Sequence, residues 1–409
     1  MDIFLKHKME VLIMNFRKKA SALALCAVLL GTTVAPVSAA THEVIRGKDR
    51  YETAAQIADK MGNYDTAILV NSDKSLADGL SASSLAGKEN APILLAKQNK
   101  LPEATAKKLE QVKKVYIIGG EKAIGKEVEA ELAGKEIIRI EGKDRMDTSK
   151  RVAELLGDYK TAFVVNGIKG EADAMSVAAL AAREKAPIIL TDGKTISDVK
   201  KDAYHYLIGG PDIISIKIDE YLEEHLNKED GFSIYESLYG MDRYDTNRVI
   251  IERFYKAANK LYFTEGTKLV DALTVSSLAK DNGVVLVSEK SDKAHLKNRA
   301  TMVQVGSVKD SIVKDIFKGE FTADKRCLRV GHTDINIEQG EKIDRNLFEA
   351  YAADIDGRDI SDEIVLDGNT DSSVLGDHFI TLRAKLSNGE ELTMKVCAYV
   401  YEASEDDAE

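Results

Sequence analysis

Three arginines and three aspartates recur along this sequence at a spacing that suits a shared chemical role. An Asp-Arg step begins each of three similar segments, and a second aspartate follows the first after 29 residues in all three. Arginine pairs with anionic groups through its planar guanidinium, whereas aspartate accepts hydrogen bonds from hydroxyl groups or binds a metal ion. The candidates for binding an anionic polymer are therefore Arg50, Asp78, Arg145, Asp173, Arg243 and Asp271.

These residues lie in two motifs that each occur three times. The first motif, G-x-D-R-[YM]-[ED]-T, begins at Gly47, Gly142 and Gly240. The second motif reads A-D-x-x-S-x-x-x-L-A in the first two copies and occupies residues 76–86, 171–181 and 269–279. Recurrence of two motifs at one fixed interval indicates tandem copies of a single structural unit.

Helical and strand patterns alternate within each copy. In the first copy, short apolar runs predict buried strands at 66–70, 92–95 and 115–118. Helices are expected from Asp49 to Met61, from Gly79 to Lys88, and from Pro102 to about Lys113. Continuously apolar strands separated by helices indicate a parallel sheet that is covered on both faces. The predicted fold class is α/β, with three tandem Rossmann-like repeats that each contain an open parallel sheet.

The first aspartate of each copy has a structural interpretation as well as a functional one. Asp49, Asp144 and Asp242 each stand where a helix N-cap is wanted, and the neighbouring arginine could pair with the second aspartate. The second aspartate follows a strand after a short loop, near the carboxyl edge of the sheet, where open α/β folds bind ligands. We therefore favour a structural role for the first motif and keep a binding role open for the second.

Other polar positions give weaker signals. Asn71 and Asn166 end the first strand of their copies, but Thr264 replaces them in the third, which argues against an invariant chemical role. Gly119-Gly120 and Gly209-Gly210 follow apolar strands without continuing into a phosphate-binding motif, so a tight turn is expected there.

The sequence offers little for catalysis. Histidines fall at positions that do not repeat, none has metal-ligand spacing, and the repeats contain neither a G-x-S-x-G motif nor a candidate cysteine nucleophile. We expect no catalytic residues, no metal and no cofactor, and a protein that is not an enzyme. Because carboxylates are abundant, an exported wall hydrolase of the amidase or glycosidase type remains the alternative.

The N-terminus has the order of a secretory signal peptide. A basic stretch at 15–19 precedes an apolar run at 20–33, and Val37-Ser38-Ala39 forms a small-residue cleavage site. The apolar run is shorter than the roughly 20 residues of a membrane span. We expect secretion to the outside of the cell or its surface, with no membrane association after cleavage and no nucleic-acid partner.

The C-terminal part differs from the repeats in charge and pattern. Residues 321–409 carry a net charge of −12, although the whole chain carries −11. Alternating strand patterns and the turn signals Asp356-Gly357 and Asn388-Gly389 predict a small all-β domain. Its two cysteines, Cys327 and Cys397, suit either a disulfide or two buried thiols. An acidic cluster at 354–359 suits either a calcium ion or, better, a solvated turn.

Together the motifs resemble the clostridial-type cell wall-binding repeat, second type. Besides the two motifs, the stretches A-P-I-[LI]-L and I-G-G carry this resemblance, which covers residues 44 to about 318. It implies three repeats packed with pseudo-threefold symmetry that hold the protein non-covalently to an anionic, teichoic-acid-like or other secondary polymer of the Gram-positive wall. The third copy departs from the family at Val284–Val287 and Gly306-Ser307, so we expect it to bind more weakly.

The sequence thus predicts five parts and one function. Residues 353–360 and 375–381 make the C-terminal domain resemble bacterial immunoglobulin-like surface modules. The expected parts are a signal peptide at 1–39, repeats at 40–137, 138–232 and 233–320, and an Ig-like β-domain with an acidic tail at 321–409. The expected function is non-catalytic wall anchoring that presents the C-terminal domain, which could have a protein partner of its own.

Overall fold

A computed structural model describes residues 40–402 apart from 74–75, 77, 230–231, 298 and 319–325. The predicted signal peptide and the acidic tail lie outside the described residues. The described repeats are mixed α/β with parallel sheets, as the alternating pattern predicted. In the part of the chain that the structure describes, no helix is long and apolar enough to cross a membrane.

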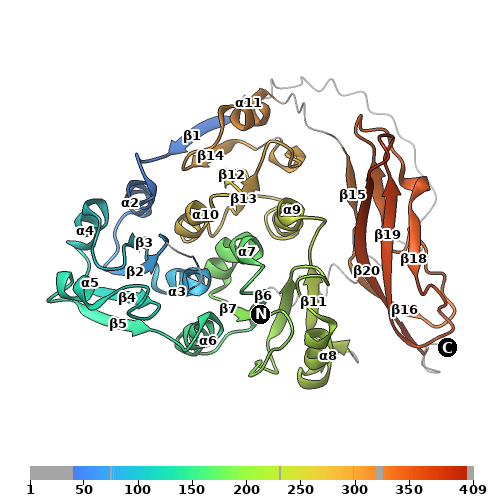
Figure 1. Cartoon of the computed structure of the whole chain (residues 1–409), viewed down its shortest axis with the longest axis horizontal. Coiled ribbons are helices and arrows are strands. Elements are labelled where there is room, and N and C mark those ends of the chain that lie inside the picture. Colours follow the sequence, from blue (N-terminus) through green and yellow to red (C-terminus); the bar gives the residue numbers. More distant parts are fainter. Residues whose placement is uncertain are drawn as a thin grey trace, which may run out of the picture. The chain divides into compact units, whose positions relative to one another are not determined.

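The three repeats contain three four-stranded parallel sheets with the same strand order (Figure 1). The first sheet has the order β3-β2-β4-β5, with strands Ile93–Ala96, Thr66–Asn71, Lys114–Ile118 and Glu136–Ile140. The second has the order β7-β6-β8-β11, with strands Ile188–Thr191, Thr161–Asn166, Tyr204–Ile208 and Tyr235–Leu238. The third has the order β13-β12-β14-β1, with strands Val284–Val287, Lys260–Glu265, Thr301–Val305 and Thr41–Ile45.

Helices cover these sheets, and the three helices predicted for the first copy are present with somewhat different ends, whereas the helix at Lys126–Glu131 was not predicted. The first copy contains α2 (Arg50–Met61), η1 (Asp78–Ser81), α3 (Ala82–Glu89), α4 (Glu103–Leu109) and α5 (Lys126–Glu131). The second contains α6 (Arg145–Leu156), α7 (Glu171–Glu184) and α8 (Ile216–His225), followed by the hairpin of β9 (Lys228–Glu229) and β10 (Phe232–Ser233). The third contains α9 (Arg243–Phe254), α10 (Leu269–Val275), η2 (Ala294–Leu296) and α11 (Asp310–Lys318).

The last strand of each sheet comes from the sequence that begins the next copy. The third sheet is completed by β1 from the start of the described chain, which pairs in parallel with β14 from Thr41↔Thr301 to Ile45↔Val305. In the same way β5 completes the first sheet by pairing with β4, and β11 completes the second by pairing with β8. The predicted boundaries at 40, 138 and 233 therefore do not separate the sheets, and the exchanged strands connect the three copies in a closed ring.

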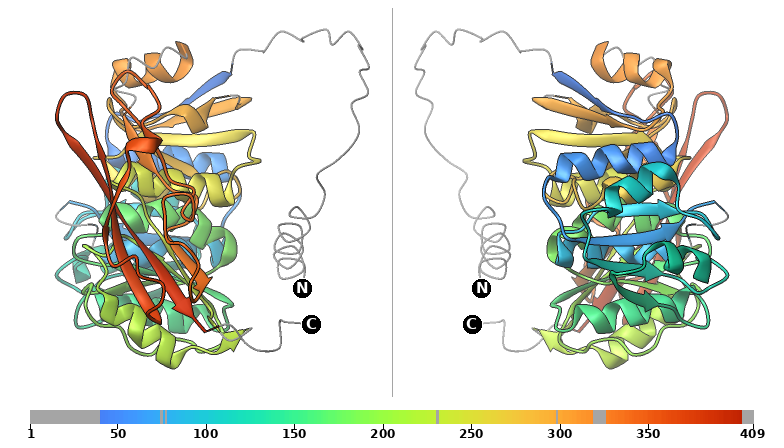
Figure 2. Two further views of the ribbon diagram at one scale, coloured as in Figure 1. Left: turned by 90° about the vertical axis from the view of Figure 1, so that its right-hand side faces the viewer. Right: turned by 90° about the vertical axis from the view of Figure 1, so that its left-hand side faces the viewer.

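The copies also share one apolar core. The largest cluster of buried side chains runs from Ile45 through all three copies to Ile316, and it includes residues of α3, α7 and α10. Small residues let these helices approach closely: a Cβ atom at Gly87 would lie 2.0 Å from the Ala182 carbonyl oxygen, and the Ser276 and Ser83 hydroxyls are 2.9 Å apart. In Figure 1, α3, α7 and α10, which belong to different copies, lie next to one another. Figure 2 shows the same arrangement turned by 90° in each direction. Shared burial makes each copy depend on the others.

The C-terminal module consists of β-strands and one 3₁₀ helix around its own core. A four-stranded sheet has the order β16-β20-β19-β18, with strands Asp334–Glu338, Glu391–Tyr401, Gly376–Lys385 and Val365–Gly368. A smaller antiparallel pair joins β15 (Cys327–Arg329) to β17 (Tyr351–Ala353), and η3 covers Ser361–Glu363. Both Cys327 and Cys397 are free thiols, which decides between the two alternatives that the sequence left open. The carboxylates of Asp354 and Asp359 accept hydrogen bonds from residues of their own turns. Asp354 is only 2% exposed and also accepts from the Ser387 backbone N–H at 3.1 Å, so the predicted solvated turn is wrong for this residue.

A substitution of Ile45 on β1 tests how much the closure of the ring by this strand stabilises the protein, because Ile45 is 3% exposed and belongs to the shared core. We expect Ile45→Ala to lower the free energy of unfolding by about 2–5 kcal/mol, as for other buried aliphatic truncations. Val44, its neighbour on the same strand, is 53% exposed, so Val44→Ala should change the stability by less than about 0.5 kcal/mol. Urea unfolding of both variants checks this, and equal effects would show that β1 contributes nothing to the core.

Candidate functional site

The first motif forms a closed hydrogen-bond network at the start of a helix. The Asp49 carboxylate accepts from the Glu52 backbone N–H at 2.9 Å, and the Glu52 carboxylate accepts from the Lys48 N–H at 2.8 Å. Asp144 and Asp242 cap their helices in the same way. These contacts satisfy N–H groups that the first turn of a helix leaves free. The predicted capping role of the first aspartate is confirmed.

The glycine and threonine of the motif complete that network. The Thr53 hydroxyl accepts from the Gly47 N–H at 3.1 Å and donates to the Asp49 carbonyl oxygen at 3.0 Å, and the other two threonines accept from the equivalent glycines. A Cβ atom at Gly47 would lie 2.2 Å from the Glu52 Cβ, so only glycine fits there. The arginine is therefore the one polar side chain of the motif left over for another role.

The arginines reach the carboxyl edges of the sheets. The Arg50 guanidinium donates to the Ser72 carbonyl oxygen at 2.7 Å, and Arg145 donates to the Gly167 carbonyl oxygen at 2.6 Å. Ser72 and Gly167 follow directly after β2 and β6. Arg50 and Arg243 are exposed and Arg145 is half-buried, so the guanidinium groups stay open to a ligand in solution.

The second aspartate of each copy lies at the same edge, as predicted. A glycine with positive φ ends β4, β8 and β14, at Gly119, Gly209 and Gly306. A Cβ atom on these glycines would lie 2.8, 3.3 and 2.1 Å from the carboxylate oxygens of Asp78, Asp173 and Asp271, respectively. Because glycine has no side chain, each of these turns leaves room for the carboxylate of the aspartate. Asp173 and Asp271 are only 8% and 6% exposed, and Asp78 is half-buried.

The effects of nearby charges on the pKa of each aspartate show which arginine lies near it. Burial raises the pKa of Asp173 to about 6, and the nearby Arg243 guanidinium opposes that rise. Burial likewise raises the pKa of Asp78, against the opposing effect of Arg145 and the Thr148 hydroxyl. In both cases the arginine comes from the following copy, so these two sites lie across a boundary between copies.

The third aspartate, Asp271, lies near an arginine of the first copy. Burial raises the pKa of Asp271 to about 6, and the positive charges of Lys268 and then Arg50 oppose the rise. Arg50 belongs to the first copy, whose β1 completes the third sheet. Lys268, which precedes α10, donates to the Ser307 carbonyl oxygen at 2.9 Å and has no counterpart in the repeated motifs. The sequence analysis missed this lysine because repetition was the signal that it used.

The exchanged strands explain why the pairs cross the boundaries. In every copy the first-motif aspartate follows the exchanged strand after four residues, as Asp144 follows Ile140. The exchanged strand ends at the carboxyl edge of the preceding sheet. The arginine that follows it therefore lies near the second aspartate of the preceding copy, which is at the same edge. Each of the three aspartates thus has an arginine of another copy near enough to affect its charge: Asp78 has Arg145, Asp173 has Arg243, and Asp271 has Arg50. Among the described residues these neighbours do not form direct ion pairs.

The arrangement suits binding. A guanidinium open to water attracts an anionic group, and a neighbouring carboxyl with a raised pKa can exchange hydrogen bonds with hydroxyl groups. The side-chain amides of Asn71 and Asn166 are used up, since they donate to the Ala123 and Ile213 carbonyl oxygens at 2.6 and 2.7 Å. Across the described residues, no group of three or more His, Cys, Asp or Glu side chains is placed to hold a metal ion.

Comparison with known proteins identifies the repeats. The family described as cell wall binding domain 2 matches the chain three times, at residues 44–129, 139–219 and 237–317. The amidase enhancer of Bacillus subtilis (strain 168) is 32% identical over 258 residues, and the N-acetylmuramoyl-L-alanine amidase LytC of the same organism is 30% identical over 257 residues. These matches cover 62% and 60% of this chain.

Solved structures agree with this assignment. Cwp8 from Clostridium difficile is 33% identical with a TM-score of 0.63 and matches 68% of this chain. Cwp6 from the same organism is 22% identical with a TM-score of 0.62 over 79% of this chain, which shows a shared fold. The chain spans 35% and 50% of the two Bacillus proteins and 51% and 56% of the two clostridial ones.

The raised pKa of Asp173 has a consequence for stability. The carboxyl holds its proton more tightly in the folded protein than in the unfolded chain, so its protonation stabilises the folded state. This stabilisation is fully present below the ordinary pKa of 3.8 and is lost as the pH rises through about 6. The variant Asp173→Asn has no carboxyl to titrate at this position. Its free energy of unfolding, compared with that of the unmodified protein at the same pH, should therefore increase by up to about 3 kcal/mol between pH 4 and 8, at roughly 1.4 kcal/mol per pKa unit. Urea unfolding at both pH values measures it.

Asp281 supplies the matched control, because its side chain is exposed. Asp281→Asn should leave the pH dependence of stability unchanged. If Asp173→Asn behaved like this control, the Asp173 carboxyl would be as well hydrated in the folded protein as in the unfolded chain.

Proposed function

The chain belongs to the cell wall binding domain 2 family, and on this premise we propose that it is a non-catalytic surface protein anchored to an anionic secondary polymer of the cell wall. The repeats associate with the wall, and the six boundary residues contact the polymer. The observation that carries this proposal is that, at all three boundaries between copies, an aspartate lies near an arginine that comes from another copy.

Three similar weak sites on one rigid ring suit a polymer better than a small molecule. Once one site holds a repeating polymer, the others bind neighbouring units at high effective concentration, which raises the overall affinity without new contacts. An enzyme gains nothing comparable from three copies of a reacting site. The third site differs from the others through Lys268, whose ammonium acts on Asp271 and is itself paired with the Glu265 carboxylate at 3.0 Å.

The polymer contact is mainly electrostatic in this proposal. The sequence contains no Trp, the side chain best suited to stacking on sugars, so recognition rests on guanidinium and ammonium groups. A polymer with phosphate or carboxylate groups, such as a teichoic-acid-like chain, fits the sites. Attachment should therefore weaken as the salt concentration rises.

The remaining parts serve export and presentation in this proposal. The N-terminal sequence directs secretion, and the C-terminal β-module acts as an immunoglobulin-like domain displayed at the surface, where it can meet a protein partner. Its own apolar core supports its folding as a distinct module. A wall hydrolase is the second candidate, because one relative is by name an amidase and another an amidase enhancer.

The test is binding of the mature protein to purified Gram-positive walls before and after acid removal of the secondary polymer. We expect strong binding only to untreated walls. Neutralising the sites in the triple variant Arg50→Gln, Arg145→Gln, Arg243→Gln should lower the affinity at least tenfold, since each charge-assisted hydrogen bond is worth about 1.5 kcal/mol or more.

A matched triple variant, Lys60→Gln, Lys107→Gln, Lys122→Gln, removes the same charge from exposed positions outside the sites and should bind walls almost normally. Equal binding to treated and untreated walls would rule out the polymer as the receptor. Clearing of a wall suspension by the purified protein would instead favour the hydrolase.

A further inference from the structure

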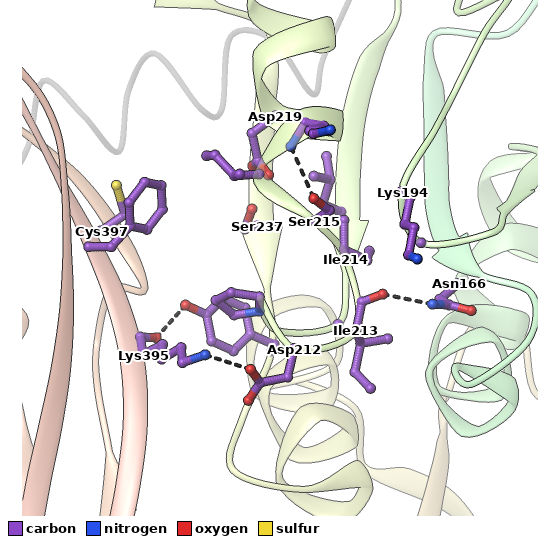
Figure 3. A pocket seen from close by; sticks show the side chains of 18 of the residues that line it. Asn166, Lys194, Asp212, Ile213, Ile214, Ser215, Asp219, Ser237, Lys395 and Cys397 are labelled. Carbon is purple, nitrogen blue, oxygen red and sulfur yellow. Dashed lines mark hydrogen bonds and ion pairs between the residues drawn. The ribbon is translucent and has the colours of Figure 1, made fainter.

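A large cleft separates the second sheet from the C-terminal module. Its volume is about 1120 Å³, and all the residues that line it belong either to residues 166–239 or to residues 334–397. One wall is formed by loops at the carboxyl edge of the second sheet, and the other by the outer face of the sheet that contains β16, β19 and β20 (Figure 3). The volume suits a ligand of several sugar units.

Specific contacts hold the two walls together. The Tyr239 hydroxyl donates to the Lys395 carbonyl oxygen, and the Lys395 ammonium pairs with Asp212 at 2.5 Å (Figure 3). The Thr333 hydroxyl donates to the Ser237 carbonyl oxygen at 2.8 Å. Tyr239 is 5% exposed, which shows that the module packs closely there. The cleft is therefore a built feature of the fold, next to the edge where the second Asp-Arg pair lies.

One side of the cleft carries cations without partners. Lys169, Lys194 and Lys217 line the cleft and are exposed, and none of the three forms an ion pair with a described residue. The nearby Asp192 carboxylate is occupied by the backbone N–H groups of Lys194 and Thr195. An anionic group entering on this side would therefore meet ammonium groups that are free to bind it.

The opposite wall offers an aromatic surface. Phe379 on β19 is 45% exposed although it is apolar, and it lines the cleft beside Cys397, its cross-strand neighbour on β20. A sugar ring presents C–H groups on its face, which can pack against an exposed phenyl ring. Free cations on one side and an aromatic ring on the other suit a sugar that carries a negative charge.

We propose that this cleft binds a short anionic oligosaccharide, so that the second repeat and the C-terminal module together form the main polymer site. This inference rests on the proposed function and deepens it, because it makes the three copies unequal. The second site gains a second wall from the C-terminal module, and the ligand there is enclosed on two sides.

Two carboxyls make binding in the cleft depend on pH. Asp219 on α8 and Asp334 on β16 both line the cleft. Partial desolvation, together with repulsion from neighbouring carboxylates, raises the pKa of each to about 7, and Asp334 keeps an exposed side chain. Asp377 on β19 faces both, with Glu220 on α8 beside Asp219 and Glu236 on β11 beside Asp334. The cations that line the same cleft are Lys169, Lys194, Lys217 and Lys395, and the last of these is already paired with Asp212.

Protonation therefore removes two negative charges from a cleft that takes an anion. As the pH falls through about 7 the carboxyls take up protons and can donate hydrogen bonds to the sugar, whereas as the pH rises they become charged and repel it. We expect affinity for an anionic fragment to fall about fivefold between pH 6 and 8, as screened repulsion across a water-filled cleft allows.

Cys397 gives a readout inside the cleft. The mature chain is labelled with N-ethylmaleimide, with and without anionic fragments released from Gram-positive walls by mild acid, and adducts are counted by mass spectrometry. At a fragment concentration tenfold above Kd, labelling of Cys397 should slow about tenfold because bound fragment covers it. Cys327, which is buried and does not line the cleft, is the control within the same molecule and should be unaffected.

Variants test the chemistry of the cleft. Lys194→Gln and Phe379→Ala should both reduce the protection of Cys397, whereas Lys100→Gln, on the corresponding loop of the first copy, should not. The double variant Asp219→Asn, Asp334→Asn should give the same protection at pH 8 as at pH 6. Each labelling rate is expressed relative to the rate without fragment at the same pH, because burial raises the pKa of the Cys397 thiol.

Binding of the same protein to intact walls is measured in parallel. This measurement distinguishes failure of the cleft site from failure of the proposed anchoring function. Wall binding without protection of Cys397 would overturn the cleft site and leave the anchoring function standing. Absence of both would overturn the two together. Protection that is equally strong with neutral maltotetraose would overturn the preference for an anionic ligand.

Discussion

The backbone pairing between neighbouring copies is the constraint on which this structure depends. Each parallel sheet has three strands from its own copy and takes its fourth from the next, and β1 closes the ring by pairing with β14. Without this strand, β14 would present an open edge and the apolar side chains at the boundary would lose their cover. The shared core that runs through α3, α7 and α10 strengthens the same dependence.

The placement of the six candidate residues follows from this exchange. A strand that crosses to the preceding sheet ends at that sheet's carboxyl edge, and the capped helix that begins after it carries an arginine there. The aspartate it meets has been desolvated by its own copy, as the raised pKa of Asp173 and Asp271 shows. Three repetitions of one backbone connection thus produce three similar sites. The C-terminal module then distinguishes one of them by covering the edge of the second sheet.

Much of this could be predicted from the sequence, because the decisive signals are local. Helix capping by Asp49 depends on residues within one turn, and the strands at 66–71 and 93–96 are short, continuously apolar runs. The exchanged strands were missed. Their sequences, such as Glu136–Ile140, are only moderately apolar, and nothing within them specifies a partner in a different copy. For the same reason the sequence placed the six candidate residues correctly at helix starts and sheet edges without showing which arginine meets which aspartate.

The most direct test of the account is the unfolding of a fragment that covers residues 40–238. This fragment retains β1 but lacks β14, its partner, and it lacks α9 and α10, which pack against α7 and α2. If the copies form one closed unit, the fragment will show no cooperative thermal transition, although it contains all the strands of the first two sheets. A sharp transition at the temperature at which the repeats unfold in the whole chain would contradict the account and show that the copies are independent domains.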